Sequence, residues 1–358
     1  MSLWHIPGEG TLSSIMNAVH LDQLKSTHHR PEGATRPGHR AKVVALITIV
    51  FCLMLWASPP TALVTGILFA LLIGQPFAHW NHNVTKWLLQ ICVVLLGFGM
   101  NLPVVLRLGL NGSVFAATTI GATLLLGYWL GRKLALDSKT STLISVGTAI
   151  CGGSAIAAVS SVIAASEAEI AVSIGTIFLL NAVALYVFPL TGHLLILSQA
   201  QFGLWAGVAI HDISSVVGAG MSYGPDALAT ATAVKLSRTL WIVPLTLALA
   251  FGIARRKPTG AEVSRRNHHF KIAVPWFIGF FLLASLLRSY VPVISTWSPQ
   301  LSEIAHRGMI LVLFLIGTSL SLRALRAVGW RTVVTGLTLW LFVSIASLLA
   351  ILLLKLTT

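Results

Sequence analysis

The sequence predicts an all-α membrane protein with about eleven transmembrane helices. Of its 358 residues, 56% are hydrophobic and only 9% are charged, and the mean hydropathy is +0.85. Soluble proteins carry about a quarter of charged residues. Hydrophobic stretches recur along the chain, and most are near the ~20 residues that a helix needs to cross a ~30 Å hydrocarbon core. Basic residues gather between these stretches, as in membrane proteins.

A polar, basic tail at residues 1–41 precedes a single transmembrane domain at residues 42–358. The tail lacks the apolar core of a signal peptide, and we expect it to be cytoplasmic. The expected spans are about 43–58, 61–77, 87–100, 112–131, 141–164, 168–189, 204–222, 227–252, 272–289, 308–322 and 332–354.

Charge distribution predicts the orientation. With the N-terminus in the cytoplasm, most of the 24 Lys and Arg residues fall on the cytoplasmic side, which the positive-inside rule favours. We therefore expect a multi-pass protein whose N-terminus is cytoplasmic. The net charge of +14 does not indicate nucleic acid binding, because the basic residues form no patch with interleaved aromatic residues.

The three cysteines, Cys52, Cys92 and Cys151, all lie in apolar stretches. Their odd number and their spacing predict neither a disulfide framework nor a metal site. We expect no cofactor.

The fifth span contains the sequence Cys151-Gly152-Gly153-Ser154 at its centre. Each glycine weakens a helix by roughly 1 kcal/mol relative to alanine, and irregular backbone is tolerated in a membrane where it lines a site or is buried in protein. We expect a broken helix whose second half begins with free N–H groups that attract anions. Candidate substrate-binding residues here are Thr148, Cys151, Gly152, Gly153 and Ser154. The alternative is a notch for close helix packing.

His211 and Asp212 lie within the seventh span. Ionisable groups inside a membrane normally face a partner, a bundle interior or a cavity. We predict that this pair couples transport to a proton or a sodium ion, since His changes charge near neutral pH. A pair that merely bonds two helices together is the alternative.

Lys235 and Arg238 lie deep in the eighth span, three residues apart, and share one helix face. Two buried cations on one face favour binding of an anion, which Arg can hold with two hydrogen bonds. The alternative is that they pair with Asp212 or Glu169, or extend toward the interface.

Two further groups of polar residues have local interpretations. Ser166 and Glu169 have the spacing of a capping box at the start of the sixth span, and we prefer that role for the acidic residues there. Asn181 is a buried amide that could reach the site or another helix.

Two short internal echoes suggest sequence repeats, which are common in secondary transporters. Gly97–Leu102 resembles Gly317–Leu322, and the two spans are expected to run in opposite directions. Gly147-Thr-Ala-Ile-Cys151 resembles Gly207-Val-Ala-Ile-His211, but these spans are expected to run in the same direction. One simple inverted repeat cannot hold both echoes on this topology.

The combined motif resembles the YeiH-type sulfate exporter family of bacterial membrane proteins over about residues 42–350. The matching parts are Gly147-x-Ala-Ile-Cys-Gly-Gly-Ser-Ala-Ile156, Ala209-Ile-His-Asp212, and Lys235-Leu-Ser-Arg238 with Pro244. Asp212-Ile-Ser-Ser215 differs from the Asp-Thr/Ser-Ala-Gln pattern of that family. The resemblance implies a multi-pass protein of the bacterial inner (plasma) membrane. It also implies inverted repeats with broken, crossing helices, similar to bile-acid symporters and sodium/proton antiporters, and export of sulfate or a related anion.

We therefore expect a secondary transporter that exports a small anion, most specifically a sulfur oxyanion, by alternating access. A cation/proton antiporter of the same architecture is the alternative. An enzyme is not expected, because the sequence contains no Gly-x-Ser-x-Gly, His-Glu-x-x-His or nucleotide-binding motif. The expected partners are a small inorganic anion, the lipid bilayer and a coupling proton or sodium ion. A homo-oligomer is left open.

Overall fold

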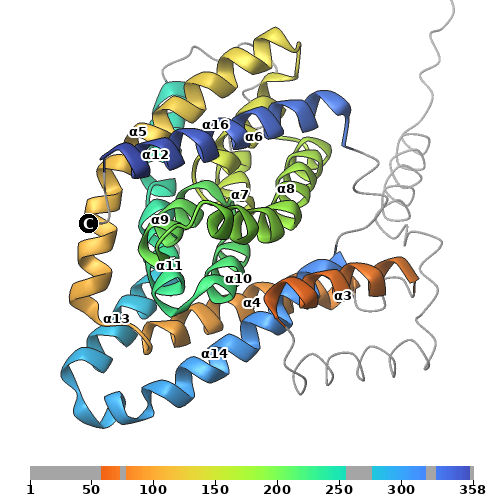
Figure 1. Cartoon of the computed structure of the whole chain (residues 1–358). Coiled ribbons are helices and arrows are strands. Elements are labelled where there is room, and N and C mark those ends of the chain that lie inside the picture. Colours follow the sequence, from red (N-terminus) through yellow and green to blue (C-terminus); the bar gives the residue numbers. More distant parts are fainter. Residues whose placement is uncertain (1–57, 73–77, 255–275, 320–327, 355–358) are drawn as a thin grey trace, which may run out of the picture. The chain divides into compact units, whose positions relative to one another are not determined.

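The computed structural model describes residues 58–72, 78–254, 276–319 and 328–354, which form helices joined by short turns (Figure 1). The predicted N-terminal tail and all but the last residue of the first predicted span lie outside the described residues. In Figure 1, α7 to α11 lie in the middle of the picture, between α5, α12 and α16 above and α4, α13 and α14 below.

Six of the expected spans correspond to single helices. Their bounds are α3 (Pro59–Leu72), α4 (Ala78–Gly97), α5 (Leu102–Lys133), α8 (Glu167–Leu194), α13 (Trp276–Tyr290) and α16 (Trp330–Leu354). The tenth expected span, 308–322, is the second half of a longer helix, α14 (Pro292–Ser319), and its last three residues lie outside the described part.

Four helical segments among the described residues are long and apolar enough to cross a membrane. They are Glu167–Leu194, Pro225–Ile253, Pro292–Ser319 and Trp330–Leu353. The second comprises α11 (Pro225–Thr239) and α12 (Ile242–Ala254), which are separated by two residues. Pro244 explains this interruption, because it has no N–H to donate to the carbonyl of Leu240.

The expected span 141–164 is broken at the predicted glycines, but its two halves do not continue in one direction. It forms α6 (Ser138–Ala149) and α7 (Gly153–Val162). The Lys139 side chain at the start of α6 donates a hydrogen bond to the Ala164 carbonyl beyond the end of α7, at 2.8 Å. Side-chain atoms of Ile156 on α7 lie 3.0 and 3.1 Å from a Cβ placed on Gly147 of α6. The segment therefore folds back on itself, and we call it hairpin 1, with its tip at residues 150–152.

The expected span 204–222 is a second hairpin, and its break was not predicted. It forms α9 (Gln199–Ala209) and α10 (Ile213–Tyr223). The Tyr223 hydroxyl at the end of α10 donates to the Leu197 carbonyl just before α9, at 2.6 Å. The Gln199 side chain accepts from the Asp226 N–H at the start of α11, at 2.9 Å. We call this segment hairpin 2, with its tip at residues 210–212.

Local sequence explains where these elements begin and end. Asp137 caps the start of α6, and both α8 and α9 begin with a capping box, formed by Ser166 with Glu169 and by Ser198 with Gln201. The predicted capping box at Ser166 is thus confirmed. Each capping box starts a new helix only a few residues after the preceding helix ends.

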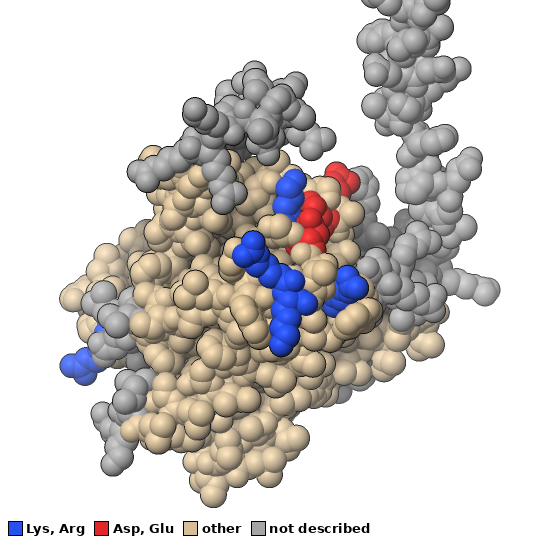
Figure 2. Space-filling view, turned by 90° about the horizontal axis from the view of Figure 1, so that it is seen from above, with Lys and Arg blue, Asp and Glu red and all other residues tan. Residues whose placement is uncertain are grey.

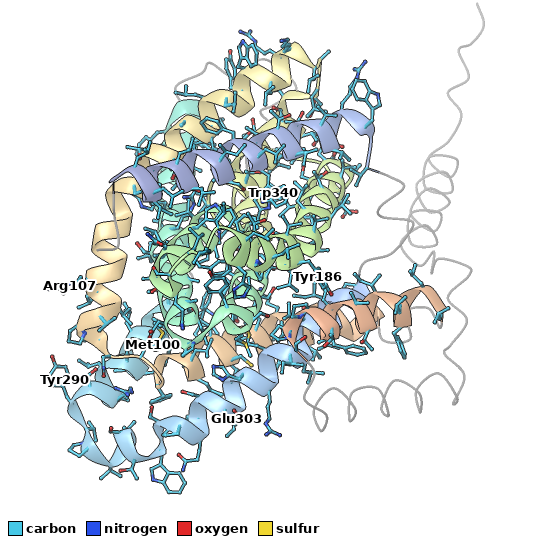
Figure 3. All side chains as sticks on the ribbon, viewed as in Figure 1. Met100, Arg107, Tyr186, Tyr290, Glu303 and Trp340 are labelled. Atoms are coloured by element: carbon cyan, nitrogen blue, oxygen red, sulfur yellow. The ribbon has the colours of Figure 1, made fainter. Side chains whose placement is uncertain are left out.

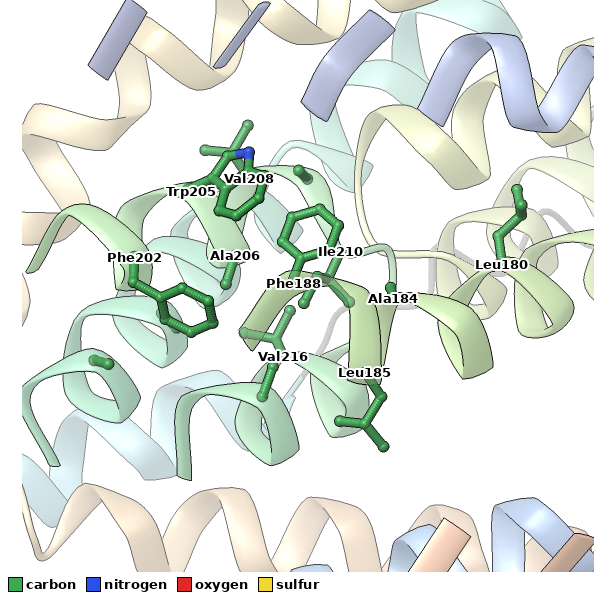
Figure 4. Close-up of a cluster of buried hydrophobic side chains, with 14 of the residues drawn as sticks. Leu180, Ala184, Leu185, Phe188, Phe202, Trp205, Ala206, Val208, Ile210 and Val216 are labelled. Atoms are coloured by element: carbon green, nitrogen blue, oxygen red, sulfur yellow. The ribbon is translucent and has the colours of Figure 1, made fainter. Parts of the chain in front are cut away.

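Hairpin 2 is held in place by an aromatic cluster (Figure 4). Phe188 of α8 stacks on Trp205 of α9, with ring centroids 4.2 Å apart, and Phe202 stacks on Tyr223 at 3.8 Å. All but Tyr223 are at least nine-tenths buried, and such aromatic pairs stabilise a core by about 0.5–1.5 kcal/mol beyond their area. The outer rims of the described part carry exposed residues such as Tyr290 and Glu303, whereas Trp340 lies inside it (Figure 3).

Candidate functional site

The tips of the two hairpins lie halfway across the expected membrane. The 12 residues of α6 and the 11 residues of α9 correspond to lengths of roughly 16–18 Å at 1.5 Å per residue, about half of the ~30 Å core. Asn181 lies at the middle of α8, and its side-chain oxygen accepts the His211 N–H of the hairpin 2 tip at 3.1 Å. The lengths of α6 and α9 and the contact with the middle of α8 therefore both place the tips near the middle of the expected membrane.

The two tips meet each other. A Cβ placed on Gly152 would lie 3.6 Å from the Asp212 Cβ and 3.6 Å from the His211 carbonyl carbon. Gly152 has φ +64° and ψ −125°, a conformation that residues other than glycine rarely adopt. The double glycine therefore gives hairpin 1 its sharp turn and lets the second tip approach closely.

Hairpin 1 leaves a helix N-terminus without a side-chain cap. Gly152 is the N-cap of α7 and has no side chain to accept from the first N–H groups. Gly153 is half-buried and Ser154 is exposed, so this end of α7 is accessible. The Ser154 hydroxyl lies 2.9 Å from the Cys151 sulfur.

Hairpin 2 carries its own cap at the corresponding place. One Asp212 carboxylate oxygen accepts the Ser215 N–H at 2.9 Å, and the other accepts the Ser214 hydroxyl at 2.5 Å. If the echo of Gly147–Cys151 and Gly207–His211 is extended by one residue, Asp212 corresponds to Gly152. At this position hairpin 2 has a carboxylate where hairpin 1 has a glycine.

Arg238 of α11 is fully buried and contacts hairpin 1. Its Nε donates to the Ala149 carbonyl at 2.6 Å, and one terminal nitrogen donates to the Thr119 hydroxyl of α5 at 2.9 Å. Ala149 is the last residue of α6, where the helix dipole leaves partial negative charge. The guanidinium therefore stabilises this helix end.

Lys235, also fully buried, contacts hairpin 2. Its ammonium donates to the carbonyl of Ile210, the C-cap of α9. Neither Lys235 nor Arg238 forms an ion pair in the part of the chain that the structure describes, where the one salt bridge joins Arg307 to Glu303. The expected alternative, pairing with Asp212 or Glu169, is therefore wrong, and both cations instead bind backbone carbonyls.

Buried polar atoms without a hydrogen-bond partner concentrate around the tips. Six of ten such side-chain atoms among the described residues belong to five residues there: Thr148 Oγ1, Asn181 Nδ2, His211 Nδ1, His211 Nε2, Thr232 Oγ1 and one terminal nitrogen of Arg238. Thr148 precedes the end of α6, and Thr232 lies one turn before Lys235. Buried polar groups normally have partners, so this group calls for a bound molecule or water.

The structure brings the sequence-predicted site residues into one region. Residues 148–154 lie at or beside one tip, and His211 and Asp212 form the other. Arg238 contacts hairpin 1 and Lys235 contacts hairpin 2. Thr119 and Thr232 were not predicted as site residues, because a threonine within an apolar span carries no distinctive signal. Asn181 was noted as a buried amide, and the structure shows that it bonds the second tip.

Outside this region, several basic residues lie at helix ends, such as Arg132 and Lys133 at the end of α5. Figure 2 shows a largely uncharged surface with Lys and Arg side chains grouped beside Asp and Glu side chains. Arg132 lies over the Tyr128 ring and Lys133 over the Trp129 ring, at 5.0 and 4.8 Å from the ring centroids, an arrangement typical of a membrane interface. Within the described ranges, no group of three His, Cys, Asp or Glu residues could hold a metal ion.

Comparison with known proteins places the chain among bacterial membrane proteins. The family model described as Conserved hypothetical protein 698 matches residues 42–336. A relative named UPF0324 membrane protein from Bacteroides thetaiotaomicron is 46% identical over 298 residues, which cover 82% of this chain and 86% of the relative. One of the same name from Porphyromonas gingivalis is 48% identical over 303 residues, 83% and 88% of the two chains. No solved structure matches.

Proposed function

Because the chain belongs to the Conserved hypothetical protein 698 family of membrane proteins, the YeiH-type family that its motifs indicated, we propose that it is a secondary transporter of a small anion. The observation that carries the proposal is the meeting of two helical hairpins at mid-membrane, surrounded by buried polar atoms without partners. Irregular backbone at this depth is typical of transporter binding sites. A multi-pass membrane protein with such a centre has the parts needed for alternating access.

The hairpins support an inverted repeat. Hairpin 1 is followed by α8 and hairpin 2 by α11 and α12, and the similar motifs Gly147–Cys151 and Gly207–His211 end the first helix of each hairpin. Since α8 runs from the base of one hairpin to the base of the other, the hairpins enter from opposite faces. The echo of Gly147–Cys151 and Gly207–His211 then relates two elements of opposite direction, as an inverted repeat requires.

Charge at the tips favours an anion. Lys235 and Arg238 contribute two positive charges and Asp212 contributes one negative charge, so these residues give the site a net positive charge in a medium where uncompensated charge is costly. The uncapped N-terminus of α7 adds partial positive charge. A sulfur oxyanion such as sulfate, exported from the cytoplasm, is the substrate that we propose.

Charge balance also suggests the coupling ion. A doubly charged anion would leave the site with one excess negative charge, and a proton on His211 would neutralise it. Both ring nitrogens of His211 lack partners, whereas both Asp212 oxygens are already bonded. We therefore propose that His211 carries a coupling proton, with the N-terminus in the cytoplasm of a bacterial inner membrane.

The test is counterflow of radiolabelled sulfate into proteoliposomes loaded with unlabelled sulfate. Thr148→Val removes one unpartnered hydroxyl with little change in volume. Loss of a hydrogen bond to a charged ligand weakens binding by roughly 10- to 100-fold, so sulfate uptake at low concentration should fall by that factor. Thr246→Val is the matched control, since that hydroxyl bonds carbonyls of its own helix, α12, at 2.8 and 2.9 Å.

Competition by other anions would then rank the substrates. Equal sulfate uptake by Thr148→Val and the wild type would show that the anion does not bind at Thr148 in the tip of hairpin 1. If no anion is transported by folded, inserted protein, the cation/proton antiporter becomes the better proposal. Asp212 favours that alternative, because it is a half-buried carboxylate at the point where the tips meet.

A further inference from the structure

The two buried cations of α11 are divided between the two hairpins. Arg238 donates to the Ala149 carbonyl of hairpin 1, and Lys235 donates to the Ile210 carbonyl of hairpin 2. In each case the acceptor lies at the inner end of the hairpin's first helix. The two contacts are therefore similar, although their acceptors are one residue apart in the alignment of the tips, and one helix makes both.

The hairpins open toward different faces. The base of hairpin 1, with Lys139 and Ala164, lies at the start of α8. The base of hairpin 2, with Leu197 and Tyr223, lies at the end of α8, 28 residues away. We call these the hairpin 1 face and the hairpin 2 face. Movement of either tip exposes the centre mainly to the face from which that hairpin enters.

We propose that Arg238 positions the tip of hairpin 1 and closes the centre to the hairpin 1 face, while Lys235 does the same for hairpin 2 and the opposite face. Both residues thereby act through the tips as positioning residues rather than only as ligands of the anion. This inference rests on the proposed transport function, because it assigns one gate of an alternating-access cycle to each cation.

Substrate can act on both gates through the same atoms. A helix C-terminus carries about half a negative charge, whereas an oxyanion carries a full charge or two. An anion at the tips therefore competes with the carbonyls of Ala149 and Ile210 for the two cations. Since Lys235 and Arg238 are one turn apart on α11, a small displacement of that helix strengthens one contact while weakening the other.

Native and introduced cysteines can report each tip separately. Cys151 lies in the hairpin 1 tip and is 3% exposed, and Ser214, in the first turn of α10, is fully buried. The hairpin 1 reporter is Cys151 in a Cys52→Ser chain. The hairpin 2 reporter is Ser214→Cys in a Cys52→Ser, Cys151→Ser chain. Each is combined with Arg238→Gln or Lys235→Gln, and labelling by a membrane-impermeant thiol reagent is measured in vesicles of both orientations.

The expected result is a crossed pattern. Arg238→Gln should accelerate labelling of Cys151 from the hairpin 1 face by roughly 10- to 100-fold, the factor expected for loss of one charge-assisted hydrogen bond. It should leave the hairpin 2 reporter nearly unchanged. Lys235→Gln should accelerate only the Ser214→Cys reporter, from the hairpin 2 face. Equal acceleration of both reporters by either variant, no acceleration, or entry from the wrong face overturns the inference.

Cys92 serves as the internal control for general loosening. It is 2% exposed and packs against Gly308 between α4 and α14, where neither cation makes a hydrogen bond. If Cys92 also becomes reactive in Arg238→Gln or Lys235→Gln, the labelling is repeated with the milder variants Arg238→Lys and Lys235→Arg. These variants must show the same crossed pattern, and its absence refutes the proposal. The labelling experiment needs no substrate. A crossed labelling pattern in a protein that shows no sulfate counterflow would therefore support the two gates and reject the proposed transport function.

Discussion

Adjacent glycines at the tip of hairpin 1 should respond in opposite ways to the same substitution. Gly152 has φ +64°, and a Cβ there would lie 3.2 Å from a methyl group of Ile177 and 3.6 Å from the tip of hairpin 2. Gly153 begins α7, and its Cβ would meet only the Phe178 ring at 3.8 Å, an ordinary contact. Gly152→Ala and Gly153→Ala therefore form a matched pair.

The magnitudes follow from the backbone. A residue other than glycine in this region of φ and ψ costs about 1–3 kcal/mol, and the close contact adds to that cost. At about 2 °C per kcal/mol for a chain longer than 150 residues, the melting temperature of Gly152→Ala should fall by roughly 2–6 °C. Gly153→Ala should match or exceed the wild type, since alanine is preferred in a helix by up to about 1 kcal/mol.

Intrinsic fluorescence of the purified protein, which contains 11 tryptophans, can follow unfolding of both variants at one scan rate. Sulfate counterflow should also fall in Gly152→Ala, because the added methyl group separates the two tips. Equal melting temperatures for the two variants would refute the geometry of the tip, since that geometry is what distinguishes the two glycines.

Three further predictions concern other parts of the fold. Asn181→Ala leaves the buried His211 N–H without its acceptor, so the free energy of unfolding in detergent should fall by about 1–3 kcal/mol. An unchanged free energy of unfolding would mean that water replaces the amide. Ile196 follows α8 in the left-handed region, with φ 52°, and its side chain is 90% exposed. Ile196→Gly should therefore stabilise the protein by about 1 kcal/mol in the same assay, and a loss of stability would contradict this left-handed conformation. Asp137 accepts N–H groups at the start of α6, chiefly that of Thr140, and these bonds lower its pKa. Because the native pKa lies below the unfolded value of about 3.9, the charged carboxylate stabilises the fold above that pH and this contribution disappears as the pH falls through the native pKa. Asp137→Asn should therefore melt below the wild type at pH 7, with a difference that shrinks on acidification; a difference independent of pH would refute the role of the charge.

Charge counting could not reveal that two predicted spans are hairpins. Making both segments re-entrant moves only two connections, residues 163–166 and 195–198, to the opposite face, and neither contains Lys or Arg. All basic loops stay on the side that the positive-inside rule assigned to them. Hydropathy was equally uninformative, because a hairpin buried among helices is as apolar as a spanning helix.

The break in hairpin 1 was predictable and that in hairpin 2 was not. Two adjacent glycines at Gly152 and Gly153 disfavour a helix wherever they occur. The sequence Ile210-His211-Asp212 contains neither glycine nor proline, and the chain turns there because Asp212 caps α10 while Lys235 binds the Ile210 carbonyl. The resemblance of Gly147–Cys151 to Gly207–His211 marked the position in hairpin 2 that corresponds to the break in hairpin 1. It indicated a second break only once both segments were known to be hairpins.

The sequence by itself determined that this protein is helical, lies in the membrane and concentrates its ionisable residues within a few apolar segments, because composition and hydrophobic length are local properties. Only the tertiary structure decided what those residues contact. Lys235 and Arg238 were predicted to face an anion or a carboxylate, but they bind the carbonyl ends of α9 and α6. Such acceptors belong to the backbone and appear only where a helix stops inside the fold, so no pattern of side chains could indicate them.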